Sequence, residues 1–450
     1  MTMHARRSTV SFLVVMGAFA TASAMIAGRQ AVQAAPPNIV LILMDDLGYG
    51  DIGSFGVPDA KTPNIDRLAR EGVRLTDFYA NGANCSPTRT GFITGRYQQR
   101  FSIEQPIPPA AAIGLLPSET SLPRLLKQRG YATALIGKWH LGSRPEFHPN
   151  KHGFDEFWGF LGPAHDYYDA AELYHNEQPA VMSGYLTDEL TTQAIRFVTD
   201  HQRDPFFMEV AYNATHFPFQ PPNLPPEKRA RPDVLHDGTR QDYVAMLESA
   251  DKGVGQILDQ LDRLQLTRNT LVVFTSDNGG EWLSRNAPMF NRKSTLWEGG
   301  IRVPALFRWP AQLPAGRVSK QVGITMDLTA SFLTAAGVTP PASYQPEGVN
   351  LLPMLREGRT VERTLFWRFK SAARDQKAVR RGRWKYMRDG VGTVDGVHEF
   401  LFDLEQDVSE RQDQSVTHIP MLVEFRKLVA DWEANVDAGK PASVQSAPAP

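Results

Sequence analysis

Four oxygen-bearing side chains follow two continuous apolar runs of the sequence. Asp45 and Asp46 come directly after the run 38–44. Asp277 and Asn278 stand shortly after a second run. Their oxygens suit a hard cation, Ca²⁺ or Mg²⁺, rather than Zn²⁺. Adjacent carboxylates at a buried strand end also repel each other unless a cation or an arginine neutralises them. Either pair alone fits an ordinary turn or loop, but two pairs at matching places predict a divalent cation site.

Basic side chains follow two other apolar runs. Lys138 and His140 are separated by one residue, so in an extended segment both side chains point the same way. His216 follows a further run, and Arg89 and Lys293 complete a cationic set. A pocket that combines a divalent cation with these groups would hold a tetrahedral oxyanion such as sulfate or phosphate. A lone histidine is usually structural, so the prediction depends on the positions of these two at the ends of the runs.

Cys85 is the only cysteine of the 450 residues and begins the segment Cys85-Ser-Pro-Thr-Arg89. Pro87 suits the first turn of a helix, where backbone N–H groups and the helix dipole favour an anion. Arg89 lies about one helical turn further on, so its side chain can return toward residue 85. The position predicts a depressed thiol pKa and a reactive thiol. The alternative is a small buried hydrophobic side chain, and a redox role lacks a resolving partner.

These residues need a frame that brings the ends of the runs together. The runs are continuous rather than alternating, which is typical of strands buried on both faces. Four strands are predicted, at residues 38–44, 131–137, 206–211 and 271–274. Helices are predicted at residues 62–70, with Thr62 as N-cap, and at 121–129 and 240–264. Strands alternating with helices imply a mainly parallel sheet covered on both faces, and such sheets bind ligands beyond the carboxyl ends of their strands.

The first 35 residues have the layout of a secretory signal peptide. Arg6 and Arg7 precede an apolar run at 12–26, and small residues at 32–34 offer a cleavage site. The apolar run is short for a membrane-spanning helix, so an uncleaved anchor is the less favoured alternative. The paired arginines hint at twin-arginine export, although the residues after them fit that signal poorly. We therefore expect an exported protein, periplasmic or secreted, without a stable membrane span.

The texture of the sequence changes after residue 355. Short strand-like pieces separated by glycine and aspartate turns occur at residues 364–369, 378–379, 384–387 and 399–402. A helix is predicted at 419–435, before a tail rich in Ala, Pro and Ser. The predicted organisation is a signal peptide at 1–35, a catalytic domain at 36–355, a small α+β subdomain with an antiparallel sheet at 356–437, and a disordered tail at 438–450.

Composition excludes several functional classes. The chain has 48 basic and 49 acidic residues and a net charge of −1, so neither a nucleic-acid binder nor a polyanion carrier is expected. With a single cysteine, no internal disulfide can form. Hydrophobic residues make up 42% of the chain, which is ordinary for a globular protein.

An ordered series of motifs resembles the sulfatase family. The segment Cys85-Ser-Pro-Thr-Arg89, continuing to Gly95-Arg96, resembles the signature of that family. Thr88 departs from it, because the family more often has serine there. The pattern is closest to arylsulfatases and N-acetylgalactosamine-6-sulfatases. Other matching pieces lie along nearly all of the mature chain: Asp45-Asp-Leu-Gly-Tyr-Gly-Asp51, Thr62-Pro-Asn-Ile-Asp66, Gly137-Lys-Trp-His-Leu-Gly142, His152-Gly-Phe-Asp155, Ser276-Asp-Asn-Gly279, and Lys293 with Trp297-Glu-Gly-Gly300.

The resemblance implies a fold, a modified residue and a metal. The fold would be the alkaline-phosphatase-like α/β/α sandwich. Cys85 would be oxidised to formylglycine by a formylglycine-generating enzyme, and one hydroxyl of the aldehyde hydrate would attack sulfur. Ca²⁺ is implied more strongly than Mg²⁺, with ligands from residue 85 and from four others: Asp45, Asp46, Asp277 and Asn278.

The resemblance also gives roles to the basic residues. His140 would take the proton from the second hydroxyl of the hydrate, so that the aldehyde reforms and expels sulfate. Lys138 and Arg89 would orient the hydrate and hold sulfate oxygens. His216 and Lys293 would stabilise and protonate the leaving alcohol. The implied activity is that of a sulfuric ester hydrolase acting on sulfated sugars or aryl sulfates.

Two other functions stay open at this point. A phosphomonoester or phosphonate ester hydrolase could use the same scaffold, because sulfate and phosphate are nearly isosteric. A non-catalytic carbohydrate-binding relative would be expected to lack Cys85, Arg89 or the aspartates, and all of these are present. The sequence does not specify the sulfate ester, the sugar position or the oligomeric state.

Three features bear on the substrate. The proline-rich segment 218–226 is expected to form a rigid loop at the rim of the pocket. The basic segment 380–385 is interpreted as a solvated strand, with contact to an acidic polysaccharide as the alternative. His165 is a candidate for a further substrate-binding residue.

Overall fold

The computed structural model describes residues 1–2, 35–118, 120–230, 236–371, 374–390 and 396–438. It divides into Met1–Ala35 and Pro36–Pro450, and the description below concerns the second unit. The predicted signal peptide and the predicted tail lie almost entirely outside the described residues. Among the residues that are described, no helix is long and apolar enough to cross a membrane.

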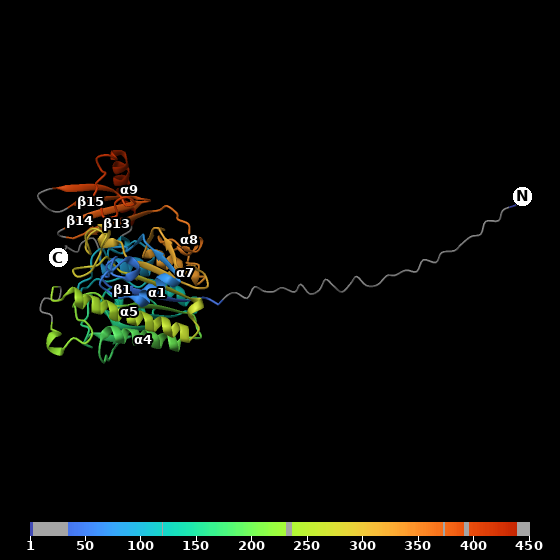
Figure 1. The fold of residues 1–450 in the computed structure, drawn as a ribbon, viewed down its shortest axis with the longest axis vertical. Helices are drawn as coiled ribbons and strands as arrows, with labels where there is room; N and C mark the ends of the chain where they lie inside the picture. Colours follow the sequence, from blue (N-terminus) through green and yellow to red (C-terminus); the bar gives the residue numbers. More distant parts are fainter. Residues whose placement is uncertain (3–34, 119, 231–235, 372–373, 391–395, 439–450) are drawn as a thin grey trace. The chain divides into compact units, whose positions relative to one another are not determined.

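A ten-stranded sheet forms the centre of this unit (Figure 1), in the order β11-β2-β10-β9-β1-β8-β4-β5-β6-β7. Its strands are β1 Asn38–Met44, β2 Val73–Leu75, β4 Ala132–Lys138, β5 Glu156–Phe160, β6 Leu173–His175, β7 Gln178–Pro179, β8 Phe206–Ala211, β9 Thr270–Ser276, β10 Ala305–Arg308 and β11 Arg317–Ser319. Neighbouring strands from β9 to β5 run parallel, while antiparallel pairs occur toward both edges. The mainly parallel sheet is confirmed, and the four predicted strands are β1, β4, β8 and β9.

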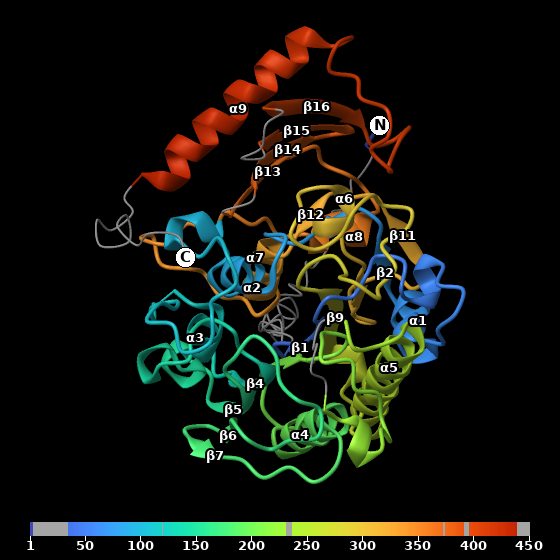
Figure 2. The same ribbon diagram turned by 90° about the vertical axis from the view of Figure 1, so that its left-hand side faces the viewer.

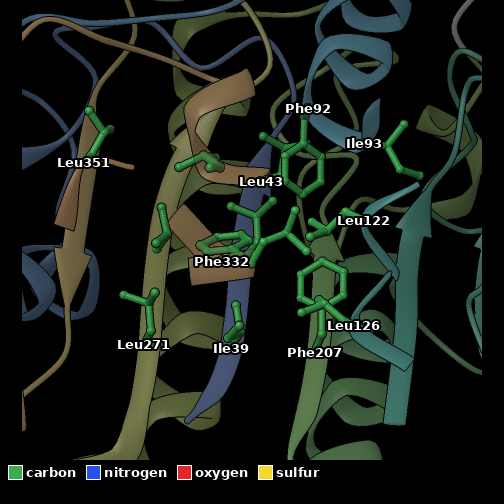
Figure 3. Close-up of a cluster of buried hydrophobic side chains, with 14 of the residues drawn as sticks. Ile39, Leu43, Phe92, Ile93, Leu122, Leu126, Phe207, Leu271, Phe332 and Leu351 are labelled. Carbon is green, nitrogen blue, oxygen red and sulfur yellow. The ribbon is translucent and has the colours of Figure 1, made fainter. Parts of the chain in front are cut away.

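Two layers of helices cover the sheet because side chains of each buried strand alternate between its faces. On β1, Val40 and Ile42 pack into the cluster that holds Leu190 and Leu247. That face is covered by α1 Pro63–Glu71, α4 Leu186–Asp200 and α5 Arg240–Arg263. Ile39 and its neighbours on the other face pack under α2 Cys85–Thr94, α3 Leu122–Lys127, α7 Met326–Ala335 and α8 Leu352–Glu357 (Figure 3).

The helix ends agree in part with the sequence. Thr239 and Asp242 form a reciprocal capping box at the start of α5, as the amphipathic pattern required a start near 240. Thr62 is the N-cap of α1, but its hydroxyl accepts from the Gly53 N–H at 2.8 Å and does not cap the helix. The remaining short elements are α6 Glu298–Ile301, the paired strands β3 Phe78–Tyr79 and β12 Gly323–Ile324, and 3₁₀ turns at Gly53–Phe55, Gln98–Phe101, Pro145–Phe147, Pro149–His152, Pro226–Lys228 and Thr267–Asn269.

A second, antiparallel sheet forms the C-terminal part, as predicted. Its strands are β13 Thr364–Lys370, β14 Asp375–Arg381, β15 Trp384–Gly390 and β16 Val397–Asp403. Figure 2 shows α9 Ile419–Asp437 lying along this sheet. Phe425 and Val429 of α9 pack against Val379 and Leu401, which explains why the sheet needs the helix.

The basic segment 380–385 is buried at its two ends, so the interpretation as a solvated strand is wrong there, while Arg381 and Arg383 between them are partly exposed. Lys385 is fully buried, and its Nζ lies 2.9 Å from Glu298 and 2.7 Å from Glu410. Arg380 is also buried and pairs with Asp77 at 2.7 Å. These ion pairs join β14 and β15 to Asp77 and Glu298, in the part of the chain that builds the central sheet. Sequence patterns could not show this, because the acidic partners lie far away along the chain.

Candidate active site

The carboxyl ends of four parallel strands bring the predicted site residues to one edge of the central sheet. Asp45 and Asp46 directly follow β1, and Lys138 is the last residue of β4. Asp277 directly follows β9. His216 and Asn278 reach the same edge, and the N-terminus of α2 delivers Cys85 to it. The structure therefore brings the predicted residues together, as the contacts described next show.

Each buried carboxylate of the site is paired with a cationic side chain. Lys138 Nζ pairs with Asp45, and both side chains are fully buried. Lys293 Nζ lies 2.7 Å from Asp46 Oδ2. Arg89 donates from Nε and Nη2 to Asp277 Oδ2 at 3.1 and 2.9 Å, and from Nη1 to the Lys138 carbonyl oxygen at 2.9 Å. The three cations balance three carboxylates, so the side chains alone leave the site near neutrality.

The donor set fits a hard divalent cation. Asn278 donates from Nδ2 to Asp46 Oδ1 at 2.7 Å, while its own Oδ1 is buried without a partner. A buried acceptor that lacks a donor is costly, and a cation would satisfy it. Ligand atoms of four residues also lie within 4.8 Å of one another: Asp45, Asp46, Cys85 and His216. A divalent ion here would make the site positive and favour an anionic ligand.

Cys85 is the first residue of α2 and only 2% of it is exposed. Its Sγ lies 3.5 Å from Asp45 Oδ1 and donates to it. Burial, with added repulsion from Asp277 and Asp45, raises the pKa of the Cys85 thiol. The predicted depressed pKa is therefore wrong: desolvation and two carboxylates outweigh the helix N-terminus. An unmodified residue 85 would be a neutral thiol and a poor nucleophile.

His140 has one ring nitrogen free for chemistry. Its Nε2 donates to the Ile107 carbonyl oxygen at 3.1 Å, which places the lone pair on Nδ1. Nδ1 is buried and has no partner. Burial, followed by the positive charges of Lys138 and Arg89, lowers the pKa of His140 well below its ordinary value. His140 is thus a neutral imidazole that can accept a proton at Nδ1.

His216 and Lys293 both face Asp46 but differ in charge. His216 Nδ1 lies 2.7 Å from the Phe217 carbonyl oxygen, and its Nε2 lies 3.6 Å from Asp46 Oδ2. Burial lowers the pKa of His216 to about 3, despite the attraction of Asp46. Although burial opposes it, Asp46 raises the pKa of Lys293 well above its ordinary value. Lys293 is therefore the charged donor of the two, and His216 donates from Nε2 only after taking up a proton.

Two site residues have backbone conformations that residues other than glycine rarely adopt. Asp46 has φ 60° and His140 has φ 58°, both in the left-handed region. Each such residue costs about 1 kcal/mol or more and persists only where the surroundings fix it. The neighbouring Asp45 is held by Ala214 and Thr215 through backbone hydrogen bonds of 3.0 and 2.8 Å. The sequence gives no sign of these turns, which aim the side chains at the site.

Sequence reasoning missed residues that support the site from behind. The Ser86 hydroxyl donates to the His140 carbonyl oxygen at 2.8 Å and accepts from the Ile107 N–H at 3.1 Å, so it fixes both the histidine and its partner. The Tyr167 hydroxyl donates to the His216 carbonyl oxygen at 3.0 Å. Adjacency to Cys85 was a usable signal for Ser86, whereas nothing in the sequence marks Tyr167.

The structure also places the two candidate substrate features. His165 Nδ1 lies 2.7 Å from the Asp166 carbonyl oxygen and its Nε2 lies 2.5 Å from that of Ala171. Both ring nitrogens therefore face carbonyl oxygens, and the side chain also lines a cavity beside Phe217, so a part of His165 in substrate binding stays a prediction. Pro218, in the proline-rich segment, lines a cavity of about 340 Å³ together with Phe217, the residue after His216.

Comparison with known proteins gives consistent matches. Residues 37–338 match the family model described as Sulfatase, and residues 288–431 match one described as N-sulphoglucosamine sulphohydrolase, C-terminal. N-acetylgalactosamine-6-sulfatase of Homo sapiens is 38% identical over 364 residues, which cover 74% of this chain and 68% of that protein. Arylsulfatase G of Rattus norvegicus is 30% identical over 465 residues, covering 88% of this chain and 86% of that protein.

Solved structures share the fold. The crystal structure of Ps i-CgsB is 32% identical with a TM-score of 0.82, covering 90% of this chain and 94% of that one. The same protein has a structure in complex with k-i-k-neocarrahexaose. Phosphonate Monoester Hydrolase of Agrobacterium radiobacter is 18% identical with a TM-score of 0.64, covering 89% and 96% of the two chains. These likenesses confirm the predicted alkaline-phosphatase-like fold class.

Proposed function

This chain belongs to the sulfatase family and is an enzyme of that class, and we propose that it hydrolyses sulfate esters of sugars by formylglycine chemistry at residue 85. The observation that carries the proposal is the position of Cys85. Its Sγ lies 3.5 Å from Asp45 Oδ1, inside a cluster of three carboxylates and three cations. Asn278 Oδ1, in the same cluster, is a buried acceptor without a hydrogen-bond partner. A cluster of this kind suits a cation and a tetrahedral anion together.

The proposed cofactors are Ca²⁺, held by residue 85 and by the oxygens of Asp45, Asp46, Asp277 and Asn278, and formylglycine made from Cys85 by a formylglycine-generating enzyme. The ion would neutralise charge on the sulfuryl oxygens. Hydrated formylglycine would supply an oxygen nucleophile and a second hydroxyl whose deprotonation releases sulfate. Mg²⁺ is less favoured on the family resemblance.

The chain's own residues would position the ester and move protons. Arg89 is fixed by Asp277 and Lys138, so its guanidinium stays beside residue 85. Lys138 and Lys293 would hold sulfate oxygens as charged donors. His140, neutral with a free Nδ1, would accept the proton from residue 85. Lys293 would stabilise the leaving oxygen, and His216 would donate to it once protonated.

Sugar sulfates are the proposed substrate class, with aryl sulfates as surrogates. The relatives named above include an N-acetylgalactosamine-6-sulfatase, and a similar structure holds a neocarrahexaose. The domain assignment is likewise a proposal: catalytic part 36–355 and subdomain 356–437. Export to the periplasm or the outside is proposed from Arg6, Arg7 and the apolar run at 12–26.

The test combines a mass spectrum with paired substrates. Protein made in a host with formylglycine-generating machinery is digested with trypsin, and the peptide Leu75–Arg89 is weighed. We expect residue 85 as aldehyde or hydrate, turnover of an aryl sulfate well above that of the matched aryl phosphate, and loss of turnover in Cys85→Ala. An unmodified thiol, or a preference for phosphate, would overturn the proposal in favour of a phosphohydrolase. Unchanged hydrolysis by Cys85→Ala would show that residue 85 is not the nucleophile.

A further inference from the structure

Two cavities adjoin one another beside the catalytic centre. The inner one, of about 390 Å³, is lined by Lys293 and by Arg374, which directly precedes β14. The outer one, of about 610 Å³, is lined by Trp282 and Arg411. Three residues stand in the walls of both: Glu281, Asn291 and Arg292. Lys293 pairs with Asp46, so the inner cavity adjoins the active site; we call the two cavities together the Trp282 groove.

The Trp282 groove is more cationic than the chain as a whole, whose net charge is −1. Arg292 forms an ion pair with Glu281 at 3.0 Å. Arg374 donates to the Ser294 carbonyl oxygen at 2.9 Å, an interaction that leaves its charge unbalanced. Arg411 is exposed and forms no ion pair with any residue in the described part of the chain. A groove with more guanidinium groups than carboxylates favours an anionic ligand.

Trp282 is an exposed aromatic side chain among these charges. Its side chain is 49% exposed, and the Arg292 guanidinium carbon lies 5.9 Å from its ring centroid. An indole that is half exposed in the wall of a cavity, beside arginines, offers one ligand both an apolar face and cationic groups. The C–H face of a pyranose ring can pack on an indole, while arginines bind an acidic substituent of the same sugar in a planar, two-point manner.

We propose that the Trp282 groove binds a second, negatively charged sugar of the substrate, next to the sugar whose sulfate is removed. Trp282 would stack on the ring, and Arg411 with Arg374 would bind its carboxylate or sulfate. The inference rests on the proposed function and deepens it: the substrate is a sulfated oligosaccharide or polysaccharide with a charged neighbouring sugar. It also gives the C-terminal part of the chain, through Arg374 and Arg411, a direct part in selection.

The test compares ratios of kcat/KM on small and extended substrates. The small one is 4-methylumbelliferyl sulfate. The extended ones are tetrasaccharides of chondroitin 6-sulfate, of ι-carrageenan and of κ-carrageenan, in which the neighbouring sugar carries a carboxylate, a sulfate or no charge. We expect Trp282→Ala and Arg411→Gln to lower the ratio of charged-neighbour to aryl substrate at least tenfold, mainly through KM. Trp282→Phe should restore most of it. The charged neighbour that Arg411→Gln affects identifies carboxylate or sulfate as the ligand.

Arg263→Gln is the matched control, because Arg263 ends α5, shortly before β9 begins, and so lies at the opposite edge of the sheet. It should leave every ratio unchanged. Ratios that stay at the wild-type value in Trp282→Ala and Arg411→Gln would overturn the proposal.

Binding separates this proposal from the proposed function. Calorimetry with Cys85→Ala protein measures the affinity of each tetrasaccharide without turnover. If the unmutated enzyme cleaves no sulfate ester, the proposed function fails, yet binding weakened at least tenfold by Trp282→Ala would still support the groove. Absence of binding to all three tetrasaccharides, or binding that Trp282→Ala and Arg411→Gln leave unaltered, would overturn the groove proposal itself.

Discussion

At the scale of single residues, the site fixes the protonation of its groups through burial and paired charges. Lys293 stays charged beside Asp46, while His140 and His216 stay neutral because burial penalises their charged forms. The two kinds of group can therefore have different roles. The charged donors hold an anion, and the neutral histidine accepts a proton. Asn278 does not titrate, but its buried Oδ1 has no hydrogen-bond partner, and the first prediction concerns this atom.

Replacing Asn278 by alanine should weaken Ca²⁺ binding. The substitution removes a neutral oxygen ligand and leaves the three carboxylates in place, so we expect a loss of at least about tenfold, equivalent to about 1.4 kcal/mol. Calorimetric titration of chelator-treated protein with Ca²⁺ measures it. Asn435→Ala, at an exposed position of α9, is the control. Equal affinities in the three proteins would remove Asn278 from the metal site.

Glu209 should make stability depend on pH. Burial raises the pKa of Glu209 from 4.5 to about 7, against the opposing charge of Arg89. Between these values the folded protein holds a proton that the unfolded chain has lost, so this group's contribution to stability falls as pH rises. Glu209→Gln lacks that titration. Its stability relative to the unmutated protein should therefore rise by about 1–3 kcal/mol from pH 4.5 to pH 8.

Urea unfolding at both pH values measures this difference. The exposed Glu146→Gln is the control and should show a constant difference. A constant difference for Glu209→Gln as well would mean that Glu209 does not titrate in this range in the folded protein.

At the scale of elements, the site depends on close approach between parallel strands. Gly137, in β4 directly before Lys138, has φ 119°, and a Cβ there would lie 1.9 Å from the Ala211 carbonyl oxygen of β8. Gly130 has φ 78° but nothing within 4 Å of a built Cβ. The two glycines separate backbone strain from steric contact.

Gly137→Ala should destabilise the protein more than Gly130→Ala. We expect about 1 kcal/mol for Gly130→Ala from its left-handed backbone alone. For Gly137→Ala we expect about 3 kcal/mol or more, since β4 and β8 must separate. The free energy of unfolding in urea provides the comparison. Equal losses would show that the strands adjust to the added methyl group without cost.

The elements that the sequence predicted well share a strong local pattern. The run 38–44 has the bounds of β1, and the helix predicted at 240–264 ends one residue after α5. By contrast α4 was missed, because it begins after Tyr185 without a side-chain cap or an early proline. Strands as short as β2 and β11 exist only through pairing with distant partners.

The candidate site was also predictable only in part. Residue types and strand ends identified the residues that meet, including Asp46 with Lys293. They could not supply burial, which reversed the expected thiol pKa of Cys85, nor the positive φ of His140. The residues of the Trp282 groove were missed because they come from separate segments and carry no shared motif.

At the scale of the whole molecule, buried ion pairs hold the C-terminal sheet to the catalytic part. Although burial opposes it, Lys385 lowers the pKa of Glu298 to about 2, and burial raises the pKa of the third member, Glu410, to about 7. Glu298 also accepts hydrogen bonds from Tyr79 and Arg302. Removal of the central lysine would leave two buried carboxylates facing each other.

Lys385→Met should therefore cost about 3–5 kcal/mol of unfolding free energy. Lys427→Met, which removes an exposed pair with Asp431 in α9, should change the free energy of unfolding by no more than about 0.5 kcal/mol. Adding Glu410→Gln to Lys385→Met should recover part of the loss, because one unpaired charge disappears. Chemical denaturation of the three variants measures these differences. A loss for Lys385→Met no greater than the control would mean that the Lys385 ion pairs do not contribute to holding the two parts of the molecule together.

Arg374 and Arg411 place part of the proposed substrate selection after the catalytic residues along the gene, whereas Trp282 lies among those residues. Every residue assigned to the sulfuryl group comes before position 294, whereas these two arginines are encoded after position 360. A descendant of this enzyme can therefore acquire a preference for a different polysaccharide through changes in its C-terminal sequence. The same change could come from recombining that stretch with a relative, and the catalytic residues would stay as they are. The exchanged stretch must keep Lys385 and Arg380, because their ion pairs attach the C-terminal sheet to the rest of the molecule.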